Sequence, residues 1–106
     1  MDIQEYQEWI CQFYKDRQWY EYNPFIRVNF LSEEVGEVAR AIRAIEIGRD
    51  RPDEIVADHE DLLKNLEEEI GDVLDNLVIL ADKYGMSLES IMASHQDKLL
   101  DRYRKS

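Results

Sequence analysis

The chain has 106 residues, enough for one domain near the lower edge of comfortable core size. Its net charge is −11, from 24 acidic and 13 basic residues, which argues against nonspecific binding to nucleic acid because such binding needs a basic surface. Four glycines, two prolines and 44% hydrophobic residues favour long helices, so we expect one all-α domain over residues 1–106.

The sequence also bears on cellular compartment. Cys11 is the only cysteine, which excludes an intramolecular disulfide, and its apolar neighbours predict a buried thiol. The first residues, MDIQEYQEW, lack the basic and apolar regions of a signal peptide. No apolar run approaches the ~20 residues that cross a bilayer. These features predict a cytoplasmic protein that does not engage a membrane.

Hydrophobic periodicity predicts four helices. The first spans about residues 3–19, and Tyr22-Asn23-Pro24 then breaks the pattern, since proline disfavours helix in the residue before it. The second spans about residues 25–47 and ends at Gly48, a residue suited to helix C-termini. Its buried stripe is expected to contain Val28, Leu31, Val35, Val38, Ile42 and Ile45.

Residues 49–58 form the least regular stretch, a charged loop or partly helical flap. The third helix spans about residues 60–84 and is expected to bury Leu63, Leu66, Ile70, Val73, Leu77 and Leu80. Ser87 is a good N-cap for a fourth helix that continues to Tyr103. Such wide apolar stripes exceed what so small a chain can cover, so we expect a four-helix, bundle-like subunit that forms a dimer or a dimer of dimers.

Two acidic pairs stand out, Glu34 with Glu37 and Glu69 with Asp72. The members of each pair are three residues apart on a predicted helix, which puts their Cβ atoms about 5–6 Å apart on one face. A helical wheel places Glu34 and Glu69 beside the apolar stripe, whereas purely surface acids would centre on the polar face. If the two helices pack together, four carboxylates meet, which is costly unless cations lie among them. Hard oxygen ligands of this kind suit Mg²⁺, with Mn²⁺ as an alternative.

Each acidic pair encloses a glycine, Gly36 or Gly71. Glycine inside a helix costs about 1 kcal/mol relative to alanine. Its presence twice at matching places predicts close approach of the two helices at the metal site.

The segments Leu31-Ser-Glu-Glu-Val-Gly-Glu37 and Glu68-Glu-Ile-Gly-Asp-Val-Leu74 resemble the E-E-x-x-E … E-x-x-D signature of MazG-like nucleoside triphosphate pyrophosphohydrolases. This all-α superfamily includes dimeric dUTPases, dCTP pyrophosphatases and phosphoribosyl-ATP pyrophosphohydrolase. The resemblance extends from about Trp19 to Tyr103. It implies metal-dependent cleavage of a nucleoside or deoxynucleoside triphosphate between the α- and β-phosphates, for sanitation or control of the nucleotide pool.

The resemblance also implies roles for particular residues. Glu34, Glu37, Glu69 and Asp72 match the metal ligands, and Glu33 or Glu34 would orient or deprotonate the attacking water. Lys98 and Arg102 resemble the K-x-x-x-R/N phosphate-binding element, and their i, i+4 spacing puts both cations on one helix face. The alternative for this pair is two surface cations that balance neighbouring aspartates.

Base or sugar recognition has three candidates. Trp19 precedes the second helix, where related dCTP pyrophosphatases carry an aromatic residue that can stack on a base; core or dimer packing is the alternative. Asn29 and Asn76 carry amides that can read a base edge or a sugar hydroxyl, and Asn76 shares a helix face with Glu69 and Asp72. Arg49 or Arg51 in the charged loop is a further hypothesis for phosphate contact.

Three other functions remain to be weighed. A di-iron carboxylate bundle needs Glu-x-x-His pairs, and the residues three before His59 and His95 are Val56 and Met92. A helical adaptor that binds nucleotides without cleaving them would be free to lose the acids and cations that this chain keeps. Phosphoribosyl-ATP hydrolysis is an alternative activity within the enzyme class, although Gly71-Asp72 is more typical of MazG-like members than of that branch.

Overall fold

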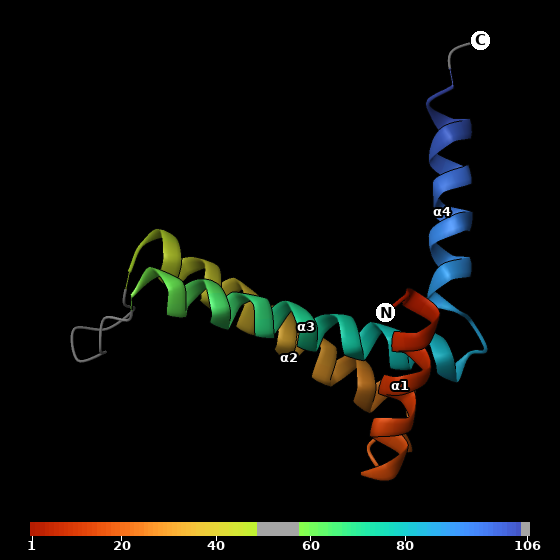
Figure 1. The fold of residues 1–106 in the computed structure, drawn as a ribbon, viewed down its shortest axis with the longest axis horizontal. Coiled ribbons are helices and arrows are strands. Elements are labelled where there is room, and N and C mark those ends of the chain that lie inside the picture. Colours follow the sequence, from red (N-terminus) through yellow and green to blue (C-terminus); the bar gives the residue numbers. More distant parts are fainter. Residues whose placement is uncertain (49–57, 105–106) are drawn as a thin grey trace. The chain divides into compact units, whose positions relative to one another are not determined.

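A computed structural model describes residues 1–48 and 58–104, and every structural statement below concerns these residues. Within them the chain is all-α, with four helices and no strand. They are α1 (Ile3–Asp16), α2 (Pro24–Glu46), α3 (His59–Lys83) and α4 (Leu88–Arg102) (Figure 1). The predicted fold class is therefore confirmed. None of the four helices is long and apolar enough to cross a membrane.

The helix ends follow from local sequence. The Asp2 side chain accepts a hydrogen bond from the backbone N–H of Glu5 and caps α1, and Ser87 caps α4 in the same way through Ser90 N–H. Asp58 accepts from the backbone N–H of Asp61 at the start of α3. Gly48 and Gly85 follow α2 and α3 with φ of +102° and +72°, the left-handed conformation that favours glycine.

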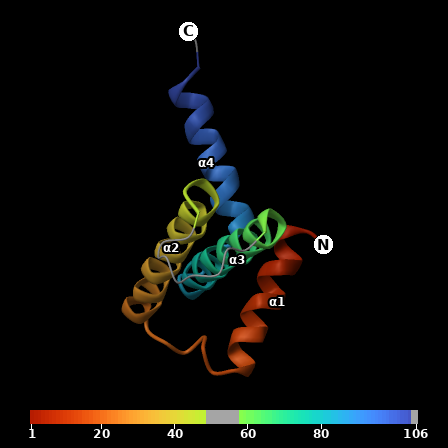
Figure 2. The same ribbon diagram turned by 90° about the vertical axis from the view of Figure 1, so that its left-hand side faces the viewer.

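The first helix ends three residues earlier than its apolar pattern predicts. Gln18 adopts φ of +64°, and the backbone N–H groups of Trp19 and Tyr20 both donate to the carbonyl of Tyr14. The helix therefore ends here, and Figure 2 shows the connection that follows α1 in orange. The sequence has no glycine at this turn, so the apolar periodicity predicted a helix that continues past its true end.

The chain divides into two compact units. The first comprises residues 1–24 and 78–106, within which α1 contributes Ile10 and Cys11 to a core with Val78 and Ile79 of α3. Burial raises the pKa of the Cys11 thiol to about 12, with help from the neighbouring Asp82 carboxylate. The predicted buried thiol is therefore confirmed, and it is protonated at neutral pH.

A partly buried polar network joins the elements of this first unit. The Gln7 side chain donates to the Asp82 carboxylate (3.2 Å) and to the Met86 carbonyl (3.1 Å), and its oxygen accepts from the Leu88 N–H (2.7 Å). The Tyr20 hydroxyl donates to Asp82 at 2.7 Å. These bonds tie α1 and the turn after it to the last turn of α3 and the start of α4.

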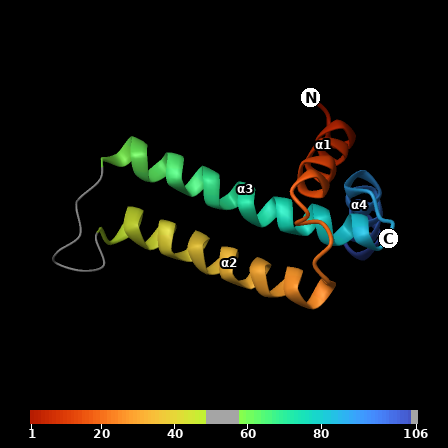
Figure 3. The same ribbon diagram turned by 90° about the horizontal axis from the view of Figure 1, so that it is seen from below.

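The second unit comprises residues 25–77, that is, α2 and most of α3. The two helices run antiparallel and side by side (Figures 1 and 3). Their expected apolar stripes are only partly covered: Val28, Val35, Ile42, Leu63, Ile70 and Leu77 remain exposed. The prediction that these residues are buried within the subunit is wrong, because two helices alone can cover only one side of each stripe.

The two helical glycines do not mark a close contact. Apart from the adjacent residues and the backbone of its own helix, a Cβ atom added to Gly36 or Gly71 would meet no atom of the described residues within 4 Å. The expected close approach of α2 and α3 at these positions is therefore wrong.

Candidate metal centre

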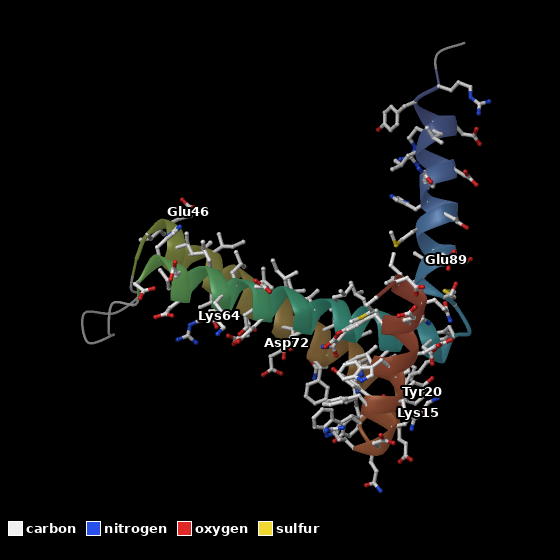
Figure 4. The ribbon with its side chains drawn as sticks, in the orientation of Figure 1. Lys15, Tyr20, Glu46, Lys64, Asp72 and Glu89 are labelled. Carbon is white, nitrogen blue, oxygen red and sulfur yellow. The ribbon has the colours of Figure 1, made fainter. Side chains whose placement is uncertain are left out.

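Three carboxylates converge where α2 and α3 face each other. Glu34 comes from α2, and Glu69 and Asp72 come from α3. One oxygen from each lies within 4.8 Å of the others. Glu34 and Glu69 are half-buried and Asp72 is exposed, so the group is open to solvent on one side; Figure 4 labels Asp72 on α3.

The electrostatics of this carboxylate group are unfavourable for bare acids. Burial raises the pKa of Glu34, and the charges of Asp72 and Glu69 raise it further. Burial also raises the pKa of Glu69, followed by the charges of Asp72 and Glu37. Within residues 1–48 and 58–104, the charges that raise both pKa values are carboxylates. Each glutamate therefore carries a repulsion that a bound cation would relieve.

The donor set fits a divalent cation. Three carboxylate oxygens within 4.8 Å provide hard oxygen donors with an open side for water or substrate. They offer neither the imidazole nor the thiolate that softer metals prefer. Mg²⁺ or Mn²⁺ therefore suits the chemistry of these side chains.

The two remaining acids of the signature lie outside this group of three. Glu37 is half-buried on α2, and its charge acts on both Glu34 and Glu69, so it lies within electrostatic reach of the group. Glu33 is exposed, and its charge raises the pKa of Glu34.

Asn76 lies one helical turn beyond Asp72 and is buried. Its Nδ2 donates to the backbone carbonyl of Asp72 at 2.8 Å, and its Oδ1 accepts from Arg27 Nη1 at 2.9 Å. Two of its polar atoms are thus engaged by the protein. The role of Asn76 in reading a base or sugar stays a prediction.

Sequence reasoning did not single out Arg27, although the structure buries it beside this site. Its position seven residues before Glu34 places the two on the same face of α2, and this spacing was the available signal. Asn29, also on α2, is exposed.

Three other predicted contact residues, Trp19, Lys98 and Arg102, belong to the first unit. Trp19 makes edge-on contacts with Tyr14 (5.5 Å between ring centroids) and Phe13 (6.2 Å), so it takes part in an aromatic cluster. Lys98 and Arg102 are both exposed on α4. Lys98 lines a surface groove with the hydroxyls of Ser90 and Ser94. Arg49 and Arg51 lie outside the described residues.

Clustered carboxylates on two antiparallel helices are the kind of arrangement from which metal sites of helical proteins are built. Residues 26–106 match the MazG nucleotide pyrophosphohydrolase domain. The chain is also 53% identical over 103 residues to YvdC, an uncharacterized protein of Bacillus subtilis (strain 168), with 97% of each chain covered.

A solved structure shares the fold. The crystal structure of YPJD from Bacillus subtilis, a candidate pyrophosphatase, matches with a TM-score of 0.70 at 24% identity, covering 100% of this chain and 97% of that one. At this identity the likeness concerns the fold alone. The domain match over residues 26–106 shows that the chain belongs to the MazG nucleotide pyrophosphohydrolase family, as its two acidic motifs predict.

Proposed function

We propose that the protein is a metal-dependent nucleoside triphosphate pyrophosphohydrolase that acts on (deoxy)nucleoside triphosphates for sanitation or control of the nucleotide pool. The observation that carries this proposal is the convergence of Glu34, Glu69 and Asp72 within 4.8 Å in a chain of the MazG family. Net charge supports it, because a chain with charge −11 needs a cation at its site to receive a polyphosphate.

In this reaction water attacks the α-phosphorus, the bond between that phosphorus and the bridging oxygen breaks, and pyrophosphate leaves a nucleoside monophosphate. Glu34, Glu69, Asp72 and Glu37 would hold Mg²⁺, or Mn²⁺ in its place, which supplies charge neutralisation at the phosphates. Glu34 or Glu33 orients the water and takes its proton. Lys98 and Arg102 bind the departing pyrophosphate through charge-assisted hydrogen bonds.

The deciding experiment measures products from a panel of ribonucleoside and deoxyribonucleoside triphosphates with Mg²⁺, Mn²⁺ or EDTA. We expect equal amounts of monophosphate and pyrophosphate, lost in EDTA. Glu69→Ala should lower kcat/KM at least about 100-fold, since it removes several kcal/mol of transition-state stabilisation. Glu67→Ala, an exposed acid on the same helix, is the matched control and should leave the rate unchanged.

Two results would contradict this proposal. Release of inorganic phosphate with a diphosphate product would exclude cleavage between the α- and β-phosphates. Tight nucleotide binding without turnover of any substrate would favour the adaptor function.

The proposed phosphate cations have their own test. Lys98→Met and Arg102→Met should raise KM about 10-fold or more each, because a charge-assisted hydrogen bond contributes about 1.5–3 kcal/mol. Arg104→Met, which removes an exposed cation from the residues just after α4, should leave KM within about twofold. Unchanged KM in both test variants would show that Lys98 and Arg102 do not bind the phosphates and only balance neighbouring charges.

A further inference from the structure

The most unusual side chain near the carboxylate group is a buried arginine. Arg27, in the first turns of α2, is 4% exposed. A guanidinium removed from water is costly unless it is hydrogen-bonded or paired. Its Nη1 donates to Asn76 Oδ1 of α3 at 2.9 Å, a bond between two buried side chains that links the two helices.

This bond fixes the orientation of the Asn76 amide. Arginine has donors only, so it selects the oxygen of the amide and turns the NH₂ group the other way. That NH₂ group donates to the Asp72 carbonyl at 2.8 Å. A continuous chain of hydrogen bonds thus runs from Arg27 through Asn76 to the backbone of Asp72, one of the three converging carboxylate residues.

The spacing along both helices places this chain of hydrogen bonds on the same helix faces as the carboxylates. Arg27 precedes Glu34 by seven residues on α2, and Asn76 follows Glu69 by seven residues on α3. Seven residues are about two helical turns, or roughly 10 Å, and return to the same face. The Arg27–Asn76 bond therefore lies on the same faces, about two turns from Glu34 and Glu69 and one turn from Asp72.

We propose that Arg27 is a positioning residue for the carboxylate group, acting through Asn76. Its bond sets the register of α2 against α3 and holds the helical turn that carries Asp72. Glu34, which comes from α2, then meets Glu69 and Asp72 with the oxygens close enough to share one cation. This inference rests on the proposed function only in requiring that the carboxylates bind a divalent ion.

Mn²⁺ binding tests this role without reference to catalysis. Arg27→Met keeps an unbranched apolar stem, although a shorter one, and removes the hydrogen-bond donors. We expect it to weaken Mn²⁺ binding, followed by electron paramagnetic resonance, about 10- to 100-fold, the range for residues that orient metal ligands. Arg40→Met, which removes an exposed arginine from the same helix, should stay within about twofold of wild type. Circular dichroism and thermal unfolding would establish that each variant is folded.

A double-mutant comparison separates positioning through Asn76 from a general effect of charge. Asn76→Leu should weaken Mn²⁺ binding as much as Arg27→Met, and the double variant should lose no more than either single one. Additive losses would overturn the proposal, since Arg27 would then act by another route. Arg27→Lys keeps the charge and a single donor nitrogen in place of the guanidinium, so it should recover part of the affinity.

The remaining outcomes are also decisive. A folded Arg27→Met variant with unchanged Mn²⁺ affinity overturns the inference even if the wild-type protein hydrolyses nucleotides. If Arg27→Met does not fold, an Arg27→Lys affinity equal to wild type overturns it, and a two- to tenfold loss supports it. A wild-type protein that binds Mn²⁺ at Glu69 but cleaves no nucleotide would overturn the proposed function and leave this inference standing. Absence of Mn²⁺ binding would overturn both.

Discussion

Glu69 has a folded-state pKa above its ordinary value, because of burial and then of the charges of Asp72 and Glu37. A carboxyl with a raised folded-state pKa contributes stability below its unfolded pKa, and that stability is lost as pH rises through the folded pKa. At neutral pH the ionised Glu69 therefore destabilises the metal-free protein. Removing its charge should relieve this penalty.

We accordingly predict that Glu69→Gln raises the Tm of the metal-free protein at pH 7. A gain of about 0.5–1 kcal/mol, the size of a few like-charge contacts, corresponds to roughly 2–8 °C for a chain of this length. The gain should disappear below the ordinary pKa of a glutamate, where the wild-type acid is also neutral. Mg²⁺ should raise the Tm of wild type but not of this variant.

Glu67→Gln is the control for the loss of one charge from α3, because Glu67 is exposed on the same helix. A lower Tm for metal-free Glu69→Gln at pH 7 would show that Glu69 is held by favourable interactions. That result would contradict the electrostatic argument for a cation at this site.

The pKa of Asp82 shifts in the opposite direction to that of Glu69. Burial alone would raise its pKa, but hydrogen bonds from Tyr20, Gln7 and Cys11 outweigh burial and lower it. Its contribution to stability is present above the unfolded pKa and is lost as pH falls through the folded pKa. Tyr20→Phe removes the 2.7 Å bond, so the folded pKa of Asp82 rises and acid unfolding begins at higher pH.

Urea titrations across pH measure this effect. Tyr20→Phe should lower the free energy of unfolding at pH 7 by about 1–3 kcal/mol, the value of a hydrogen bond to a charged group. Tyr84→Phe removes an exposed hydroxyl from the same unit and should change neither quantity. An unshifted acid midpoint for Tyr20→Phe would mean that Asp82 is stabilised without this hydroxyl.

At the scale of helices, the start of α4 is held by a side chain from α1. Gln7 Oε1 accepts from the backbone N–H of Leu88 at 2.7 Å, satisfying one of the amides that a helix leaves unpaired at its N-terminus. Its amide also donates to the Met86 carbonyl just before the helix. One side chain thereby anchors the α3–α4 connection from both directions.

Gln7→Leu should therefore speed hydrogen exchange at the Leu88 amide and lower the free energy of unfolding by about 1–3 kcal/mol, since buried partners are left unsatisfied. Gln4→Leu on the same helix is the matched control, because Gln4 bonds only locally, to Glu8. Equal exchange at Leu88 in both variants would show that the bond to Gln7 does not protect this amide.

The elements show which parts of the fold the sequence could predict. Helix identities and most helix ends were predictable because their causes are local: Asp2 and Ser87 as caps, Gly48 and Gly85 at the C-termini. The convergence of Glu34 with Glu69 was also foreseeable, since two amphipathic helices with acids beside their stripes must bring those acids together. The turn at Gln18 could not be predicted, because a residue other than glycine adopts the positive φ there.

What stayed beyond sequence reasoning depends on contacts between residues far apart in the chain. The Arg27–Asn76 bond joins positions 49 residues apart. The spacing to Glu34 gives the helix face of Arg27, but the sequence does not give its partner on the other helix. The interpretation of Gly36 and Gly71 failed for the related reason that helix separation is set by neighbouring side chains, not by the glycines alone.

At the scale of the whole chain, exposed apolar side chains on α4 favour association with a second copy of the chain. Helix α4 has no buried residue, and Met92, Leu99, Leu100 and Tyr103 are exposed along it. Leu100 is 59% and Tyr103 73% exposed. Contiguous apolar side chains of this kind are unusual on a monomer, so we propose a homodimer or homotetramer.

We predict that light scattering at micromolar concentration gives two or four times the chain mass of 12.7 kDa. Leu100→Glu places a charge in the apolar stripe of α4 and should shift the protein toward monomer, because a buried unpaired charge costs several kcal/mol. The matched control is Ser94→Glu on the face of the same helix that carries Ser90 and Lys98, and it should leave the mass unchanged.

If Leu100→Glu keeps the wild-type mass, α4 lies outside the interface, and the exposed stripes of α2 and α3 become the next surface to test. A monomeric wild type would contradict assembly altogether and would make these stripes a cause of aggregation.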